Sequence, residues 1–252
     1  MRLLKPILIA VWSLAAGSCL GQTVTDPNDL GPGRRVLFIG NSYLYTQDIP
    51  GIVQALADSA GGDQLAVATV AGPDLALIDH WNIGTARNAI AQGHWEWVVL
   101  QQGPSSTALN RDTLRLATEY FAADIASIGA VPALFSAWPA ENRRQDFPRA
   151  IESYTLAAAD VSGMLLPVAS AWLAAWDRDP DLQLYVDGLH PSVDGAYLAA
   201  LVIYARLLGQ SPSGLPATLR TRSGRTISVT PQTAALLQAA AAEATQPISG
   251  RP

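Results

Sequence analysis

The chain has 252 residues, a formal net charge of −5 and 49% hydrophobic residues. This is enough apolar material for a sizeable core, and the length suits a single α/β domain. The acidic balance argues against a nucleic-acid-binding protein, which needs a basic face. Three histidines and one cysteine exclude zinc fingers, iron–sulfur clusters and disulfide scaffolds on ligand count. No acidic cluster has metal-ligand spacing, so we expect no metal and no other cofactor.

Residues 1–21 have the layout of a secretory signal peptide: early basic residues, an apolar run over 6–16, and then small residues. The apolar run is too short to span a bilayer in the ordinary way. An ordinary signal peptidase could cut near Ser18 or Gly21. Alternatively, Cys19 follows Ala-Gly-Ser, which resembles a lipoprotein cleavage box, and would then carry a lipid that tethers the chain to a membrane. Both alternatives predict a secreted or periplasmic protein.

The rest of the chain divides into three parts. Residues 22–33 are rich in Pro, Gly, Asp and Asn without periodicity, and are predicted to form a linker. Residues 34–210 hold the main domain. Residues 211–252 are predicted to be an appendage on the same domain, with a polar hairpin over 218–229 and an Ala-rich helix over 233–245.

Within the main domain, apolar runs alternate with helical periodicity. The runs predict five strands, at 36–40, 65–70, 96–100, 131–135 and 164–168. Helices are predicted over 50–60, 74–79, 85–92, 112–128, 149–161 and 194–208. Because the strands are continuously apolar and alternate with helices, they predict an α/β fold with a mostly parallel sheet that is buried on both faces.

The first candidate functional residue is Ser42. Ligands of open parallel sheets bind at the carboxyl ends of the strands, and Gly40-Asn41-Ser42 follows the first strand directly. Gly40 permits a tight turn there. The Ser42 hydroxyl could attack a carbonyl, and its backbone N–H could help to hold the resulting oxyanion. The alternative is a serine that only caps a helix.

A serine nucleophile needs a base, and the base needs an acceptor that orients it. Asp187 and His190 are three residues apart in the segment Asp-Gly-Leu-His-Pro, where a turn would let the carboxylate reach one imidazole nitrogen and leave the other free. The alternative is a surface turn with a capping aspartate. His80 and His94 do not follow the carboxyl end of a strand and are expected to be structural.

Together these two segments resemble the SGNH (GDSL-type) esterase and lipase superfamily. The matching segments are VLFIGNSY, residues 36–43, and DGLHPS, residues 187–192, and the resemblance covers roughly residues 34–208. It implies a flavodoxin-like, three-layer α/β/α fold and ester hydrolysis by Ser42, Asp187 and His190. Asn41 stands where the family's name motif has Asp.

The same resemblance implies an oxyanion hole built from three donors. The backbone N–H of Ser42 is the first, and Gly72 matches the family glycine that supplies the second. For the third, the family has Gly-x-Asn-Asp after the third strand, whereas this chain has Gln101-Gln102-Gly103-Pro104-Ser105. Gln102-Gly103 resembles the Gln-Gly-Glu-Ser block of carbohydrate acetylesterases, and a Gln amide offers the same donor as Asn. Gln102 is therefore the predicted third donor, with Gln101 and Ser105 as alternatives.

These observations predict an exported serine esterase that acts on short acyl groups, with O-acetyl groups on carbohydrate as the favoured substrate. Trp138, after the fourth strand, could form a wall of the substrate cleft or could pack in the core. An acyltransferase that uses the same Ser42 is one alternative. A catalytically weak, envelope-anchored carbohydrate-binding protein is another, because the third block departs from the family pattern.

Overall fold

The computed structural model describes residues 22–246. The predicted signal peptide, including Cys19, lies outside the described residues, as do residues 247–252. Export and lipid attachment therefore stay predictions from the sequence.

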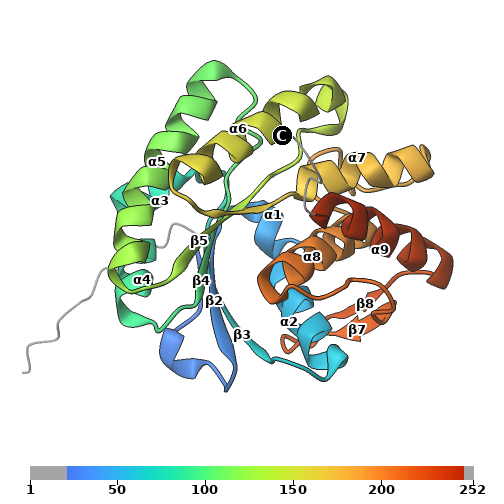
Figure 1. Ribbon diagram of the computed structural model, residues 1–252, viewed down its shortest axis with the longest axis horizontal. Coiled ribbons are helices and arrows are strands. Elements are labelled where there is room, and N and C mark those ends of the chain that lie inside the picture. Colours follow the sequence, from blue (N-terminus) through green and yellow to red (C-terminus); the bar gives the residue numbers. More distant parts are fainter. Residues whose placement is uncertain (1–21, 247–252) are drawn as a thin grey trace, which may run out of the picture.

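The core of the described chain is a mostly parallel β-sheet (Figure 1). Its order is β1-β3-β2-β4-β5-β6, and every neighbouring pair is parallel except β1 with β3. The strands are β1 (Thr23–Val24), β2 (Arg34–Gly40), β3 (Leu65–Ala71), β4 (Trp97–Leu100), β5 (Val131–Phe135) and β6 (Met164–Leu166). The five predicted strands are thus present, and the sheet gains a sixth at its edge.

Helices cover both faces of the sheet, which confirms the three-layer α/β/α fold (Figure 1). One face is covered by α2 (Ile49–Ala60) and α8 (Val193–Leu208). The other is covered by α3 (Leu77–Ile83), α4 (Thr85–Gln92), α5 (Ala108–Ser127) and α6 (Phe147–Asp160). The remaining elements of the main domain are α1 (Ser42–Tyr45), α7 (Val168–Arg178) and the 3₁₀ turns η1 (Pro27–Asp29) and η2 (Glu141–Asp146). No helix within residues 22–246 is both long enough and apolar enough to cross a bilayer.

The continuous apolar runs of the sequence suit strands that are covered by helices on both faces. Val36 to Ile39 in β2 and Val98 to Leu100 in β4 have no exposed surface. Burial of this apolar surface on two sides is the main favourable contribution to folding.

Two predicted segments differ from the structure. The segment 22–33 is predicted to be a linker, but Thr23 and Val24 pair with β3, and Thr25 and Thr69 exchange two further hydrogen bonds. The helix predicted over 74–79 instead begins at Leu77. Asp74 has a positive φ of 56°, which keeps it out of a right-handed helix. The carboxylate of Asp79 accepts the N–H of Ala76 and so caps the helix there.

The C-terminal segment packs on the main domain as a hairpin and a helix. The hairpin consists of β7 (Thr218–Arg220) and β8 (Thr226–Ser228), and α9 (Pro231–Thr245) packs against α7 and α8. The turn of the hairpin reaches the loop before α2, where the Ser223 hydroxyl donates to the Asp48 carboxylate at 2.7 Å.

The topology decides where a ligand site can form. Among the parallel strands the chain order is second, first, third, fourth, fifth, because β3 and β4 lie on opposite sides of β2. The connections after β2 and β4 therefore leave toward opposite faces of the sheet and open a crevice at the carboxyl ends of these two strands. Gly40 and Leu100 are the last residues of the two strands, so the residues that follow them line this crevice.

The packing of α9 can be tested with a matched pair of leucines. Leu237 is fully buried, whereas its neighbour Leu236 is only partly buried. Leu237→Ala is expected to lower the free energy of unfolding by about 2–5 kcal/mol because it leaves a cavity, and Leu236→Ala by about 1 kcal/mol. Chemical denaturation of both variants measures the difference. Equal effects would show that α9 is not held in the way described.

Candidate functional site

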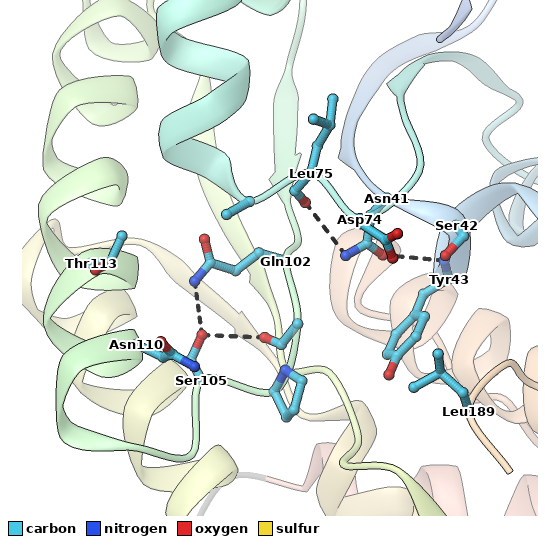
Figure 2. A pocket seen from close by; sticks show the side chains of 13 residues that line it. Asn41, Ser42, Tyr43, Asp74, Leu75, Gln102, Ser105, Asn110, Thr113 and Leu189 are labelled. Atoms are coloured by element: carbon cyan, nitrogen blue, oxygen red, sulfur yellow. Dashed lines mark hydrogen bonds between the residues drawn. The ribbon is translucent and has the colours of Figure 1, made fainter. Parts of the chain in front are cut away.

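A pocket of about 300 Å³ lies at the carboxyl ends of β2 and β4. Its lining comes from the segments after β2, β3 and β4, from the first turns of α5, and from the loop before α8 (Figure 2). The residues are Asn41, Ser42, Tyr43, Asp74, Leu75, Ala76, Gln102, Gly103, Pro104, Ser105, Asn110, Thr113 and Leu189. This is the crevice that the topology predicts.

Ser42 begins the short helix α1 directly after β2. Asn41 caps this helix, since its side-chain oxygen accepts the N–H of Tyr43 at 3.2 Å. Ser42 lines the pocket, and its backbone N–H is left without an intrahelical partner because Ser42 is the first residue of the helix.

The structure brings Ser42, His190 and Asp187 together in one chain of hydrogen bonds. His190 Nε2 lies 3.0 Å from Ser42 Oγ, and His190 Nδ1 lies 2.7 Å from Asp187 Oδ2. Because a carboxylate only accepts, Nδ1 carries the proton, and Nε2 accepts the hydroxyl of Ser42. This is the arrangement of a serine nucleophile, its base and the acceptor that orients the base.

The local sequence explains how Asp187 and His190 meet. Asp187 Oδ1 accepts the backbone N–H groups of Leu189 and His190, at 3.0 and 2.7 Å, so the carboxylate closes a tight turn on itself. Gly188 has a φ of 81°, a backbone conformation that glycine adopts without strain. Ser192 then caps α8 through Gly195 N–H. A turn thus brings the Asp187 carboxylate to the His190 ring, as the D-x-x-H spacing predicts.

These hydrogen bonds control the ionisation of Asp187. The bond with the His190 imidazole, helped by the two backbone N–H groups, lowers the pKa of Asp187 to about 2 from its ordinary 3.8. The Asp187 side chain is 52% exposed, so its contact with the His190 imidazole adds little to stability. The chemical consequence is a carboxylate that remains ionised and keeps the imidazole in one tautomer.

Trp138, a predicted candidate for the wall of the substrate cleft, is fully buried and cannot contact a ligand in this structure. Its ring stacks on Tyr43 with centroids 4.8 Å apart, and on Trp172 with centroids 4.2 Å apart. Its indole N–H donates to the carbonyl of Leu189 at 3.0 Å. Trp138 therefore contacts the residue after Ser42 and holds the residue before His190.

Two more hydrogen bonds fasten the His190 loop to the segment after β5. The hydroxyl of Tyr185 donates to the carbonyl of Pro139 at 2.6 Å, and the N–H of Glu141 donates to the carbonyl of Gly188 at 2.8 Å. The loop is thus held at three points along its length. No motif in the sequence predicts that these residues hold the His190 loop.

Gly72 does not have the predicted free N–H. Its N–H donates to the carbonyl of Gly40 at 3.1 Å, which extends the pairing of β2 and β3. The same carbonyl accepts the Nε2–H of His80 at 2.8 Å. His80 is fully buried, and burial lowers its pKa, so it stays neutral and fixes the end of β2. His94 is exposed and lies outside the pocket.

Gln102, the predicted third donor, is built into the pocket wall opposite Ser42 (Figure 2). Its Oε1 accepts the N–H of Leu77 at 2.9 Å, and its Nε2 donates to Ser105 Oγ at 2.8 Å. Ser105 in turn donates to the carbonyl of Gly103 at 3.2 Å. Neither Gln102 nor the alternative Ser105 thus points its donor at Ser42.

Gln101, the other alternative, holds Asn41 instead. Gln101 Oε1 accepts the backbone N–H of Asn41 at 2.9 Å, and Gln101 Nε2 donates to Asn41 Oδ1 at 3.0 Å. Gly40 makes room for this pair, because a Cβ at that position would overlap Gln101 Oε1. The amide of Asn41, which lines the pocket beside Ser42, is a polar group that the motif comparison missed.

The pocket lining contains one charged residue, Asp74, and neither Lys nor Arg. Several neutral donors and acceptors surround it, and Leu75, Ala76, Pro104 and Leu189 supply apolar surface. Within residues 22–246 no three His, Cys, Asp or Glu residues are grouped as metal ligands would be. The arrangement can position a small, uncharged or cationic molecule against the Ser42 hydroxyl.

No protein-family model matches the chain, and no curated protein matches it either. Solved structures do match. A DUF4886 family protein from Bacteroides uniformis is 18% identical, with a TM-score of 0.68 over 84% of this chain and 94% of that one. A candidate SGNH hydrolase from Slackia heliotrinireducens is 26% identical, with a TM-score of 0.60 over 70% of this chain and 100% of that one. An acetyl xylan esterase is 16% identical, with a TM-score of 0.57 over 68% of this chain and 98% of that one.

These likenesses agree with the predicted resemblance. A lipase/acylhydrolase from Enterococcus faecalis, 17% identical, also matches, with a TM-score of 0.55 over 70% of this chain and 96% of that one. The chain has the SGNH-type hydrolase fold, and carbohydrate esterases are among its structural neighbours.

Proposed function

We propose that the chain is a serine esterase that hydrolyses short acyl esters, with O-acetylated carbohydrate as its substrate class. The observation that carries the proposal is the chain of hydrogen bonds from Asp187 through His190 to Ser42, at the edge of a pocket. The SGNH-type fold supports it, because hydrolases and esterases share this fold.

In the proposed reaction, Ser42 Oγ attacks the ester carbonyl carbon while His190 Nε2 accepts the hydroxyl proton. The tetrahedral intermediate collapses, the bond to the alcohol oxygen breaks, and His190 returns the proton to the departing alcohol. Water then attacks acyl-Ser42, again with His190 as base, and releases the carboxylic acid and free Ser42. Asp187 stabilises the imidazolium that forms in each half of the cycle.

The pocket supports the choice of substrate. A volume of about 300 Å³ is at the lower end for ligand sites and favours a short acyl group over a long chain. Asp74 can accept hydrogen bonds from sugar hydroxyls, and it would repel a substrate that carries a negative charge near the ester. The predicted signal peptide would bring the esterase to extracytoplasmic carbohydrate.

The alternative of a non-catalytic binding protein fits the site less well. A binding protein gains nothing from a serine hydroxyl 3.0 Å from an imidazole that is itself oriented by an ionised carboxylate. An acyltransferase would use the same first half-reaction with a different acceptor, and no feature of the pocket favours it over hydrolysis.

Ser42→Ala removes the proposed nucleophile and should leave the fold unchanged. We expect hydrolysis of p-nitrophenyl acetate and of acetylated xylo-oligosaccharides to fall by about 10⁴-fold or more. Steady-state kinetics on wild type and variant, with thermal unfolding as a control for folding, measure the loss. If Ser42→Ala retained most of the hydrolysis, another residue would have to be the nucleophile.

The low pKa of Asp187 predicts a simple pH dependence. Since its folded-state pKa is about 2, Asp187 stays ionised at every pH above about 4. The acid limb of kcat/KM above pH 4 should therefore contain no ionisation of Asp187 and should follow one ionisation, that of the catalytic base. Any contribution of Asp187 to stability is present above pH 3.8 and lost only as the pH falls toward 2. A limb that follows two ionisations above pH 4 would be inconsistent with this assignment.

Trp138→Phe keeps an aromatic ring in the stack but removes the N–H that holds Leu189. We expect kcat to fall by about 10-fold to 100-fold with little change in KM, because the His190 imidazole is then held less accurately against the Ser42 hydroxyl. Trp95→Phe is the matched control: Trp95 is also buried and donates to the Ala89 carbonyl at 2.8 Å, but it lies outside the pocket. Equal kcat values for the two variants would show that Trp138 only stabilises the core.

A further inference from the structure

The side chain of Asn41 has a fixed orientation. Its Oδ1 accepts both Gln101 Nε2 at 3.0 Å and the N–H of Tyr43 at 3.2 Å. Two donors on the oxygen leave only one way to place the amide, with Nδ2 on the opposite side. Asn41 is 7% exposed, so solvent competes little with these bonds.

The amide nitrogen of Asn41 is available for a further acceptor. It points toward the carbonyl of Leu75, a pocket residue (Figure 2). That contact is 3.5 Å long, which is at the limit for a hydrogen bond and therefore weak. An NH₂ group has two protons, so at least one can be donated to a ligand beside Ser42.

Two of the three groups expected to hold the oxyanion are turned to other partners. Gly72 N–H donates to Gly40, and the Gln102 amide bonds Leu77 and Ser105 on the opposite wall. A tetrahedral intermediate on Ser42 needs donors that lie ready before the reaction begins. Among the described residues next to Ser42, the Asn41 amide meets this requirement.

We propose that Asn41 Nδ2 and the backbone N–H of Ser42 hold the oxyanion, and that Gln101 is the positioning residue that aims the Asn41 amide. This assignment rests on the proposed esterase function. It moves the side-chain amide from the segment after β4 to the segment after β2. The same exchange accounts for two departures from the family pattern, an Asn at position 41 and the absence of Gly-x-Asn-Asp after β4.

Asn41→Asp tests the assignment with the smallest possible change. One carboxylate oxygen replaces Oδ1 and can still accept from Gln101 and Tyr43, while the other replaces the donor with an acceptor. We expect kcat to fall by about 10²–10³-fold with a small change in KM. Gln102→Glu is the matched amide-to-carboxylate control, in which one oxygen can still accept from Leu77 and Ser105 can rotate its hydroxyl to donate. Its loss should be below about tenfold.

A thionoester separates a lost oxyanion donor from a charge effect on His190. Sulfur accepts hydrogen bonds poorly, so wild type should prefer p-nitrophenyl acetate to the matching thionoacetate. A new charge near His190 would slow both substrates equally, whereas loss of the donor should reduce the preference by about tenfold or more. Thermal unfolding of each variant shows whether it is folded.

The outcomes are distinct. The assignment is overturned if Asn41→Asp keeps kcat within about tenfold, if its preference for the oxoester is unchanged, or if Gln102→Glu loses more than Asn41→Asp. Wild type that hydrolyses neither ester would overturn the esterase function and this assignment with it. Activity that depends on Ser42 but not on Asn41 would overturn this assignment alone.

Discussion

The account depends on one hydrogen bond, between the Ser42 hydroxyl and His190 Nε2, which joins residues 148 positions apart. One partner is placed by the end of β2, and the other by the loop between α7, which ends at Arg178, and α8, which begins at Val193. Trp138 connects the two, because it stacks on Tyr43 and donates to the Leu189 carbonyl. A buried aromatic stack is rigid, so the distance between nucleophile and base is set by core packing.

Amide side chains also hold the segments around the pocket in place. Gln101 and Gln102 follow one another after β4 but serve different neighbours: Gln101 holds Asn41, and Gln102 holds the start of α3 through Leu77. Each accepts a backbone N–H that would otherwise lack a partner, that of Asn41 after β2 and that of Leu77 at the start of α3. The walls of the pocket are thus fixed before a ligand arrives, which favours preorganised binding.

Much of the fold followed from the sequence, because continuous apolar runs and helical periods depend on local pattern. The segments that hold Ser42, Asp187 and His190 were also visible, since each is a short motif at a strand end or turn. The two-residue strand β1 was missed because only its pairing with β3 makes it a strand. The sequence did not reveal the hydrogen-bond partners of Gly72 and Gln102, namely Gly40, Leu77 and Ser105, because tertiary packing sets them. The sequence left two roles open for Trp138, core packing or a wall of the cleft. In the structure its ring stacks on Tyr43 and Trp172 in the core.

The central claim is that Ser42 is an activated nucleophile. A fluorophosphonate reacts covalently with an activated serine, and peptide mapping by mass spectrometry identifies the residue that carries the adduct. We predict a single adduct on Ser42, formed more slowly by at least about 100-fold when His190 is replaced by Ala, because the base is then missing. Labelling at another residue, or no labelling of the folded protein, would contradict the account.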